Sequence, residues 1–375
     1  MSGIIHVMIF AAIAIAFLLD QIRPVESGHA AAMLPRRWIG AAARYVDAGG
    51  RLYAWLAWAL AVMAPVLAAG LIGWLCIRVA GWFGQLAWAV AVLYLTLGFR
   101  QFSHHGTAIR DALAAGDRDK ARTLLARWQN GEAGYPGPLP EGLAERGFTR
   151  DPIARGAIAY AVLLAHRWVF GVLFWFCLLA PLGLAPAGAV LYRYAEFAAD
   201  YWRYKTGKGE PAASPALLAV AQAVWHVIDW LPARMTALAF AVVGNFEDAI
   251  AAWRQRQAGD TDGGANEGND AILLAAAAGA LGIRLDDGGA VAPPPAADRP
   301  AVLAYPEAAQ AGADVYPPDW ETVTSPDEVA PAGVSDMSGA DIDVRYFAQV
   351  AGLLWRGVAL WLLLLLLLTL AHVLG

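Results

Sequence analysis

Long apolar stretches alternate with polar ones along this chain, and several have the length of membrane-spanning helices. Apolar runs occupy residues 4–19, 52–77, 79–99 and 350–373. A helix needs about 20 predominantly apolar residues to cross the hydrocarbon core of a bilayer, so the first run is short and the others are long enough. Only Arg78 separates the second run from the third, which predicts a tight helical hairpin. The pattern predicts an all-α, polytopic helical membrane protein.

A further apolar run covers residues 157–192 and is interrupted near its middle. Pro181, Gly183, Pro186 and Gly188 stand there. Because each proline removes a backbone donor, one continuous helix through this run is disfavoured. We expect a helical hairpin or a re-entrant pair. The prediction is then six membrane segments, of which a stricter count keeps four.

The polar stretches between these runs predict two loops and an insertion. Residues 20–51 are expected to form a basic loop, and residues 100–156 a helical insertion. Within the insertion, the pattern indicates two short helices with a turn at Gly116 and Asp117. Asp117 has the side chain and the position of an N-cap for the second helix.

The second half of the chain combines amphipathic and low-complexity sequence. The region 157–257 is predicted to be the interrupted membrane hairpin followed by amphipathic helices, with Pro232 breaking the helix that contains it. The region 258–349 is acidic and rich in Pro and Gly, with one short apolar helix at 271–283. We expect most of this linker to be disordered, because such composition buries too little apolar surface to offset the loss of chain entropy.

Charge gives the chain an expected orientation. Most of the 27 Lys and Arg residues lie in 20–51, 100–156 and 193–349. Basic loops of membrane proteins stay in the cytoplasm, so we expect these regions on the cytoplasmic side of a bacterial inner membrane. Half of the 32 Asp and Glu residues lie in 260–343. A nucleic-acid partner is not expected for a chain with such an acidic segment.

Motifs for catalysis and metal binding are absent from the sequence. There is no P-loop, no His-Glu-x-x-His motif and no Gly-x-Ser-x-Gly motif. Cys76 and Cys177 both lie in apolar runs without ligand-like spacing, so we predict buried thiols, no disulfide and no metal site. No catalytic residue is assigned on this basis.

Two places along the chain carry candidate site residues. His226 and Asp229 share one helical face, and Arg234 is expected to turn back beyond Pro232 and pair with Asp229. This group indicates either a structural ion pair at a helix bend or an anion or substrate site beside the membrane. Arg167 lies inside an apolar run, where it either extends to the membrane surface or serves a function.

Several motifs resemble the CobD/CbiB family of cobalamin-biosynthesis membrane proteins. The segment D-W-L-P-A-R-M-T-A-L at 229–238 is similar to the family's N-x-x-P-A-R-L-T-A-L. Residues 113–122 resemble L-x-x-G-D-x-x-x-A-R, residues 278–285 resemble A-G-A-L-G-V-R-L, and Asp341-Ile342 with the last helix resembles the family's C-terminal part. The resemblance implies an enzyme that joins cobyric acid to an aminopropanol or its phosphate, with a nucleotide triphosphate and Mg²⁺.

The family's acidic positions are where this chain departs from the resemblance. The family has motifs with Asp, Glu or Asn at several places. The corresponding positions of this chain carry few carboxylates; they are 128–131, 163–171, 196–201 and Trp225-His226. Triphosphate chemistry usually uses carboxylates to hold Mg²⁺, so the departures imply loss of synthase activity. Residues 166–175 and 224–234 resemble instead AmpE, an inner-membrane protein of the same superfamily that is linked to β-lactamase induction.

The sequence therefore predicts a non-catalytic, AmpE-like sensing or regulatory protein of the inner membrane. The alternative is an adenosylcobinamide-phosphate synthase that uses nucleotide triphosphate and Mg²⁺. The first reading needs no cofactor and no metal. Expected partners are the lipid bilayer, a small-molecule or corrinoid ligand, and a protein partner bound through the acidic linker. The predicted ligand-binding residues at a cytoplasmic mouth are Arg167, His226, Asp229, Arg234, Glu196 and Arg203.

Overall fold

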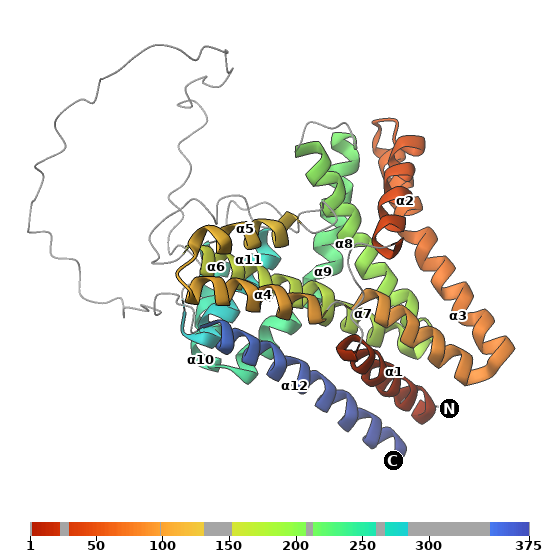
Figure 1. Cartoon of the computed structure of the whole chain (residues 1–375). Helices are drawn as coiled ribbons and strands as arrows, with labels where there is room; N and C mark the ends of the chain where they lie inside the picture. The colour runs from red at the N-terminus through yellow and green to blue at the C-terminus, as the bar shows by residue number, and fades with distance from the viewer. Residues whose placement is uncertain are drawn as a thin grey trace, which may run out of the picture. The chain divides into compact units, whose positions relative to one another are not determined.

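The computed structural model describes residues 2–22, 30–97, 99–130, 152–207, 213–259, 267–283 and 346–374. These residues are almost entirely helical and contain no β-strand, which confirms the all-α class (Figure 1). Most of the predicted acidic linker and the second half of the predicted insertion lie outside the described residues. The helices are α1 (Ser2–Ile22), α2 (Ala30–Val46), α3 (Arg51–Thr96), α4 (Phe99–Ala114), α5 (Arg118–Asn130), α6 (Pro152–Ala165), η1 (His166–Phe170), α7 (Gly171–Leu179), η2 (Ala180–Leu182), α8 (Ala185–Gly207), α9 (Pro215–Val243), α10 (Phe246–Gly259), α11 (Glu267–Leu281) and α12 (Tyr346–Leu374).

Four segments within the described ranges are long and apolar enough to cross a membrane. They are Arg51–Thr96, Ile153–Leu182, Pro215–Val243 and Tyr346–His372. Large apolar side chains are exposed along α3, α9 and α12, as expected for helices that face lipid. The chain is thus a polytopic membrane protein. The first apolar run lies in α1, whose part Val7–Ile22 is a shorter apolar helix and is not among these four segments.

The α3 segment doubles back on itself and forms a hairpin. At Gly81 the backbone has φ 62° and ψ −146°, a conformation that glycine adopts without steric cost. Beyond it, Trp88 Nε1 donates to the carbonyl of Ala69 over 3.0 Å. In a straight helix these residues would lie about 28 Å apart. The reversal therefore lies at Gly81, three residues after the Arg78 that the sequence indicated.

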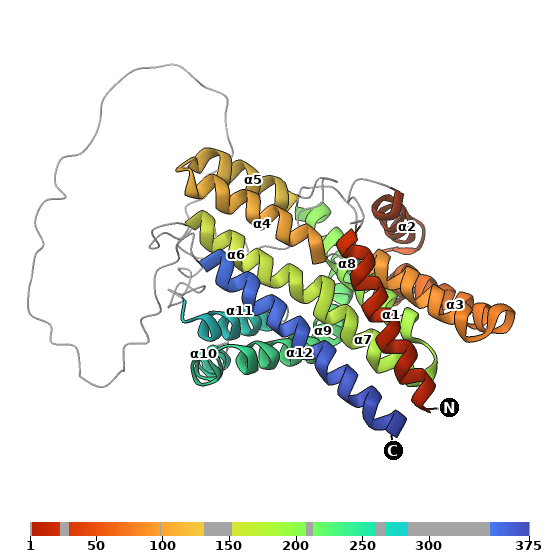
Figure 2. The same ribbon diagram turned by 60° about the horizontal axis from the view of Figure 1, so that its bottom comes forward.

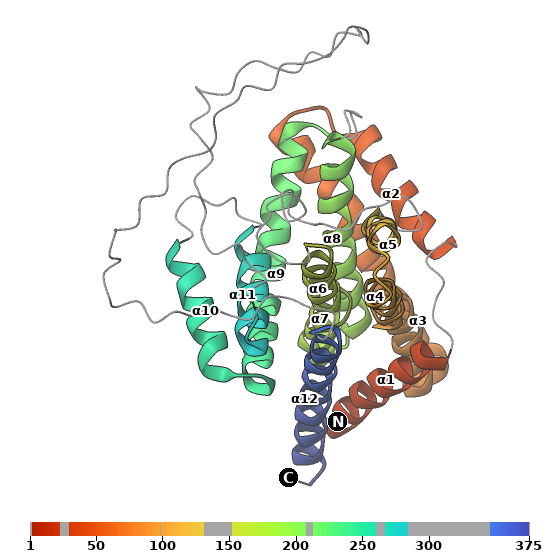
Figure 3. The ribbon, with the colours of Figure 1, turned by 60° about the vertical axis from the view of Figure 1, so that its left-hand side comes forward.

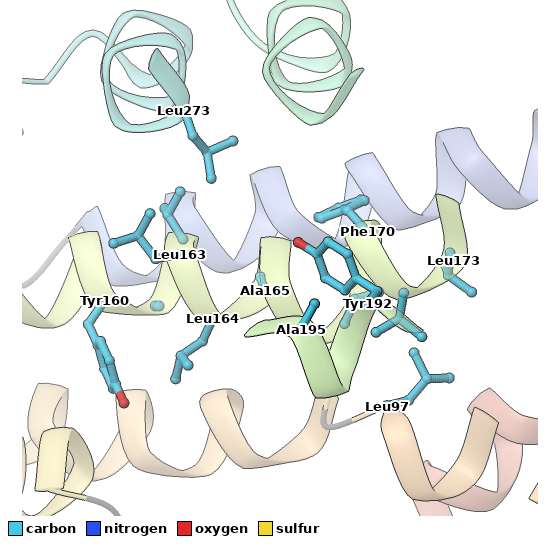
Figure 4. Packing of buried hydrophobic residues seen from close by; sticks show 14 of the residues in the cluster. Leu97, Tyr160, Leu163, Leu164, Ala165, Phe170, Leu173, Tyr192, Ala195 and Leu273 are labelled. Atoms are coloured by element: carbon cyan, nitrogen blue, oxygen red, sulfur yellow. The ribbon is translucent and has the colours of Figure 1, made fainter. Parts of the chain in front are cut away.

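The chain reverses again between α7 and α8, within the run that Pro and Gly interrupt. Gly183 has φ 74° and its N–H donates to the carbonyl of Ala180 over 2.9 Å. The helix α8 then packs back along α7. Figure 4 shows the α6–α7 segment between neighbouring helices, with Leu163 and Leu273 pointing toward one another. This hairpin places residues of η1 opposite residues of α8.

The helix α9 continues without a break through Pro232, so the predicted break there is wrong. Proline lacks the N–H that would bond the carbonyl of Ile228, four residues earlier. Trp175 of α7 supplies this bond, because its indole Nε1 donates to the Ile228 carbonyl over 3.1 Å. A neighbouring helix thus satisfies the acceptor that proline leaves open, as is common in membrane helices.

The predicted helical pair of the insertion is confirmed as α4 and α5. Gly116 has φ 76° at the turn, and Asp117 Oδ1 accepts a hydrogen bond from the Lys120 N–H over 3.0 Å. Asp117 is therefore the N-cap that the sequence indicated. Both helices pack against α6.

The remaining helices enclose the central α6–α7 segment and α8. The terminal helices α1 and α12 pack against one another, as Figure 2 also shows. On another side α10 and α11 pack together and against α9 (Figure 3). The helix α11 begins beside the middle of α9, and this placement brings polar residues of both helices toward η1.

Candidate functional site

A single π-helical turn, η1, carries the two ionisable residues at the centre of the site. The turn is closed by a hydrogen bond from the Gly171 N–H to the His166 carbonyl, a five-residue step. Such turns are rare and occur frequently at functional sites. His166 is fully buried and Arg167 is 2% exposed. Arg167 therefore does not extend to the membrane surface, and that alternative is wrong.

Arg167 joins three elements through two short ion pairs. Its Nη1 donates to Asp200 Oδ2 of α8 over 2.9 Å, and its Nη2 donates to Asp270 Oδ2 of α11 over 2.8 Å. Asp200 is also bonded through Oδ1 to Arg203 Nη2, over 2.8 Å. The Trp225 ring of α9 lies 5.7 Å from the guanidinium carbon. The buried cation is thus balanced on two sides by carboxylates, which a charge in this environment requires.

His166 is the centre of a second hydrogen-bonded group. Its Nε2 lies 2.9 Å from Asp229 Oδ1, and its Nδ1 lies 2.9 Å from Thr236 Oγ1. Tyr192 OH of α8 donates to the same Asp229 oxygen over 2.7 Å. An ionised carboxylate only accepts, so Nε2 carries the proton in the bond to Asp229. Thr236 also donates to the Pro232 carbonyl over 2.9 Å and is completely buried, so its hydroxyl is not available to a substrate.

The approach of Tyr192 to this group depends on Gly171. A Cβ at position 171 would lie 2.1 Å from Tyr192 Cζ, far inside van der Waals contact. Figure 4 shows the Tyr192 ring beside Phe170, against the α6–α7 segment. Glycine therefore allows the phenol to reach both His166 and Asp229.

Asn269, in the first turn of α11, connects the buried group with residues nearer the surface. Its Nδ2 donates to the His226 carbonyl over 3.1 Å and approaches Asp229 Oδ2 at 3.4 Å. Its Oδ1 accepts from Arg234 Nη1 over 3.0 Å. Arg234 does not pair with Asp229, contrary to the expectation. Because α9 is continuous, the five-residue separation turns the two side chains about 140° apart around the helix.

Glu196 lies at the edge of the cluster, in α8, which is not among the four candidate spans. Its carboxylate is in contact with the guanidinium of Arg193, which lies 5.3 Å from the Trp168 ring. Burial raises the pKa of the Glu196 carboxyl to about 7, although Arg193 and Arg167 act in the opposite direction. Glu196 can therefore bind or release a proton near neutral pH.

The structure divides the six predicted residues into an inner and an outer set. Arg167, Asp229 and Glu196 are buried in the cluster, and Arg203 is attached to it through Asp200. His226 and Arg234 lie on the outer side, where Asn269 links them to the interior. The cluster has further members that the predicted set left out: His166, Tyr192, Asp200, Thr236, Asn269 and Asp270.

The arrangement of donors does not fit a metal ion. Within the ranges that the structure describes, no three His, Cys, Asp or Glu side chains are placed so that together they could hold one. Each of the four carboxylates already has a protein partner. The site is a polar cluster of internally bonded side chains inside a helical membrane protein.

Comparisons with known proteins find two curated relatives with the same name. The chain is 29% identical over 262 residues to a cobalamin biosynthesis protein CobD of Stutzerimonas stutzeri, covering 70% of this chain and 74% of the relative. It is 32% identical over 203 residues to a cobalamin biosynthesis protein CobD of Chromobacterium violaceum, covering 53% of this chain and 55% of the relative. It thus spans about half the length of the second relative.

These two relatives support the resemblance to the CobD/CbiB superfamily that the motifs at 113–122, 229–238 and 278–285 carry. No family model matches the chain, and no solved structure matches it. The likeness of residues 166–175 and 224–234 to AmpE stays a prediction.

Proposed function

We propose that this chain is a membrane-embedded ligand-sensing member of the CobD/CbiB superfamily that does not form the amide bond of the synthases. The observation that carries the proposal is the engagement of all four carboxylates of the site. Asp200 and Asp270 bind Arg167, Asp229 binds His166 and Tyr192, and Glu196 contacts Arg193. A carboxylate held in this way is already engaged by a protein partner and is not free to bind Mg²⁺.

The residues present do not fit the cofactor that the synthase reading needs. That reading requires acidic oxygens that converge on the Mg²⁺ of a bound nucleotide. Here the acidic oxygens of the described cluster point at guanidinium, imidazole, phenol and amide groups instead. Within α9, no Asp or Glu precedes Asp229, so the positions around Trp225 add no carboxylate. A binding function requires none of these features.

The second candidate function is adenosylcobinamide-phosphate synthase. The names of the two relatives, cobalamin biosynthesis protein, favour it. Within the site, Glu196 also favours it, because a carboxyl with a pKa of about 7 can take up the proton that an amine loses when it becomes an amide. This reading predicts that the chain consumes nucleotide triphosphate only when a corrinoid acid and an aminopropanol are both present.

Complementation separates the two candidates. A strain that lacks its own synthase is supplied with this chain and grown with cobyric acid as the only corrinoid. We expect no growth, and no triphosphate consumption by purified full-length protein with cobyric acid and aminopropanol or its phosphate. Growth, together with triphosphate consumption, would contradict our proposal. If Glu196→Gln abolishes both, the chain is a synthase that uses Glu196. A membrane-targeted, folded protein must be verified in the same strain.

The sensing function has its own test in the organism that carries the gene. We expect deletion to change the induction of β-lactamase by an inducing β-lactam, and Arg167→Met to reproduce the deletion. Unchanged induction in the deletion strain argues against a role in this response. The proposal of a sensing protein would then depend on a demonstration of ligand binding alone.

We further propose that the basic loops lie in the cytoplasm and that the membrane is the bacterial inner membrane. The distribution of Lys and Arg supports this orientation. In a variant without Cys76 and Cys177, single cysteines at Lys120 and Thr206 should resist a membrane-impermeant thiol reagent in intact cells. Both should react after the cells are opened. Labelling of either position in intact cells would show that this position lies outside, contrary to the proposed orientation.

A further inference from the structure

We propose that the outer face of α9 binds the phosphate headgroup of an anionic membrane lipid at Arg234, independently of the function of the buried cluster. The helix presents a continuous stripe of exposed apolar side chains within a candidate membrane span. Arg234 lies in the middle of this stripe. The exposed members on either side are Val227, Trp230, Leu231, Met235, Leu238 and Val242.

Arg234 keeps unused donors on this lipid-facing surface. Its Nη1 donates to the Trp230 carbonyl over 2.9 Å and to Asn269 Oδ1 over 3.0 Å. Among the described residues, Nε and Nη2 have no hydrogen-bond partner, and the side chain forms no ion pair. A guanidinium stays charged in proteins, so it needs a counter-charge when lipid surrounds it. A phosphate accepts two parallel bonds from such a group.

The neighbours of Arg234 shape a place for such a headgroup. The guanidinium carbon lies 4.1 Å from the centre of the Trp230 ring, which holds the side chain flat along the helix. His226 lies eight residues before Arg234, about 80° from it around the helix, and its Nδ1 is buried without a hydrogen-bond partner among the described residues. Asn269 fixes both ends, because it bonds the His226 carbonyl and Arg234.

Neither nearby acidic group forms an ion pair with Arg234 among the described residues. Asp229 is 1% exposed and is bonded to His166, Tyr192 and Asn269. Asp270 is committed to Arg167. A lipid fits better than a soluble anion, because its acyl chains can cover the apolar stripe while its phosphate meets Arg234. The proposed ligand therefore carries both a negative headgroup and a hydrocarbon tail.

The chain offers a matched control. Arg78 also lies in a candidate span and also faces a tryptophan four residues earlier, with its guanidinium carbon 5.0 Å from the Trp74 ring. It is exposed, but it has no counterpart of His226 and Asn269 in its described contacts. If membrane arginines attracted anionic lipid only by their charge, Arg78 and Arg234 would behave alike.

The test is native mass spectrometry of purified full-length protein in detergent, titrated with phosphatidylglycerol, with phosphatidylcholine and with inorganic phosphate. We expect phosphatidylglycerol to bind in preference to phosphatidylcholine, and Arg234→Gln to weaken this binding about tenfold. Arg78→Gln should change it less than about twofold. His226→Gln leaves Arg234 in place and should weaken binding by a few fold, which keeps the test valid if Arg234→Gln does not fold.

Three results would overturn the proposal. Unchanged lipid binding in a folded Arg234→Gln protein would show that Arg234 does not bind the lipid. An equal loss in Arg78→Gln would show attraction by charge alone. Displacement of the lipid by inorganic phosphate at equal concentration would indicate a site for a soluble anion instead.

Discussion

Replacing Arg167 by methionine is the most direct test of the buried cluster. The substitution keeps an unbranched, apolar stem, shorter than that of arginine, and removes the guanidinium that bonds Asp200 and Asp270 at 2.9 and 2.8 Å. The Asp200 side chain is then left 4% exposed and the Asp270 side chain 14% exposed. Asp200 keeps Arg203 as a partner, whereas Asp270 loses the ion pair that neutralises it. We therefore assign most of the cost to Asp270.

The size of the effect follows from that difference. Removing one partner of a buried ion pair costs ~3–5 kcal/mol, because the remaining charge stays desolvated. We expect Arg167→Met to lower the free energy of unfolding within this range. Adding Asp270→Asn removes the stranded charge and should restore roughly 1–3 kcal/mol, the cost of one unsatisfied buried group. The double variant should therefore be more stable than the single variant.

The measurement is reversible unfolding in mixed detergent micelles with increasing sodium dodecyl sulfate, followed by circular dichroism. Arg110→Met is the matched control, because Arg110 pairs with Asp111 where both side chains are largely exposed. Such a surface pair contributes about 0–1 kcal/mol. A loss below about 1 kcal/mol for Arg167→Met, or a double variant less stable than the single one, would contradict the assigned role of Arg167.

Three further substitutions test separate parts of the structure. Gly171→Ala places a Cβ 2.1 Å from Tyr192 Cζ and should lower the free energy of unfolding by about 1–3 kcal/mol, whereas Gly352→Ala, with open space around it, should not. Tyr192→Phe removes the 2.7 Å bond to Asp229 and should cost roughly 1.5–3 kcal/mol in the same titration. Asp117→Ala removes the cap of α5 and should cost about 1 kcal/mol, seen as faster amide hydrogen exchange in that helix alone. An unchanged value in any of these measurements contradicts the contact concerned.

Much of the fold could be predicted because hydrophobic length and glycine or proline position act locally. The leucine-rich run after residue 350 becomes α12, and the capped turn at Asp117 joins α4 and α5. The break expected at Pro232 fails for a reason that lies outside the local sequence. The indole of Trp175, 57 positions earlier in the chain, supplies the bond that proline cannot form.

The candidate site was predictable only in part, because some of its residues stand out in the local sequence and others are brought in by distant contacts. An ionisable residue in an apolar run, such as Arg167, is conspicuous in the sequence. Its partners are not, because Asp200 follows it by 33 positions and Asp270 by 103. Asp270 also lies at the edge of an acidic, low-complexity region, where a single functional carboxylate has no distinguishing signal. Only the packing of α11 against α9 and α6 brings it to Arg167.

The balance of charges in the cluster connects its structure with the proposed sensing function. Arg167 joins η1 to α8 and α11, while His166 in the same turn joins it to α9 through Asp229. Both adjacent residues are buried because the α6–α7 segment around η1 is enclosed by other helices on all sides. A ligand cation would compete with Arg167 for Asp270, and a ligand anion would compete with Asp270 for Arg167. Either exchange replaces the ion pair between η1 and α11, so a charged ligand would change how these two elements are held together. A site built to hold Mg²⁺ would instead keep its carboxylates free of arginine, which is the opposite of what surrounds Arg167.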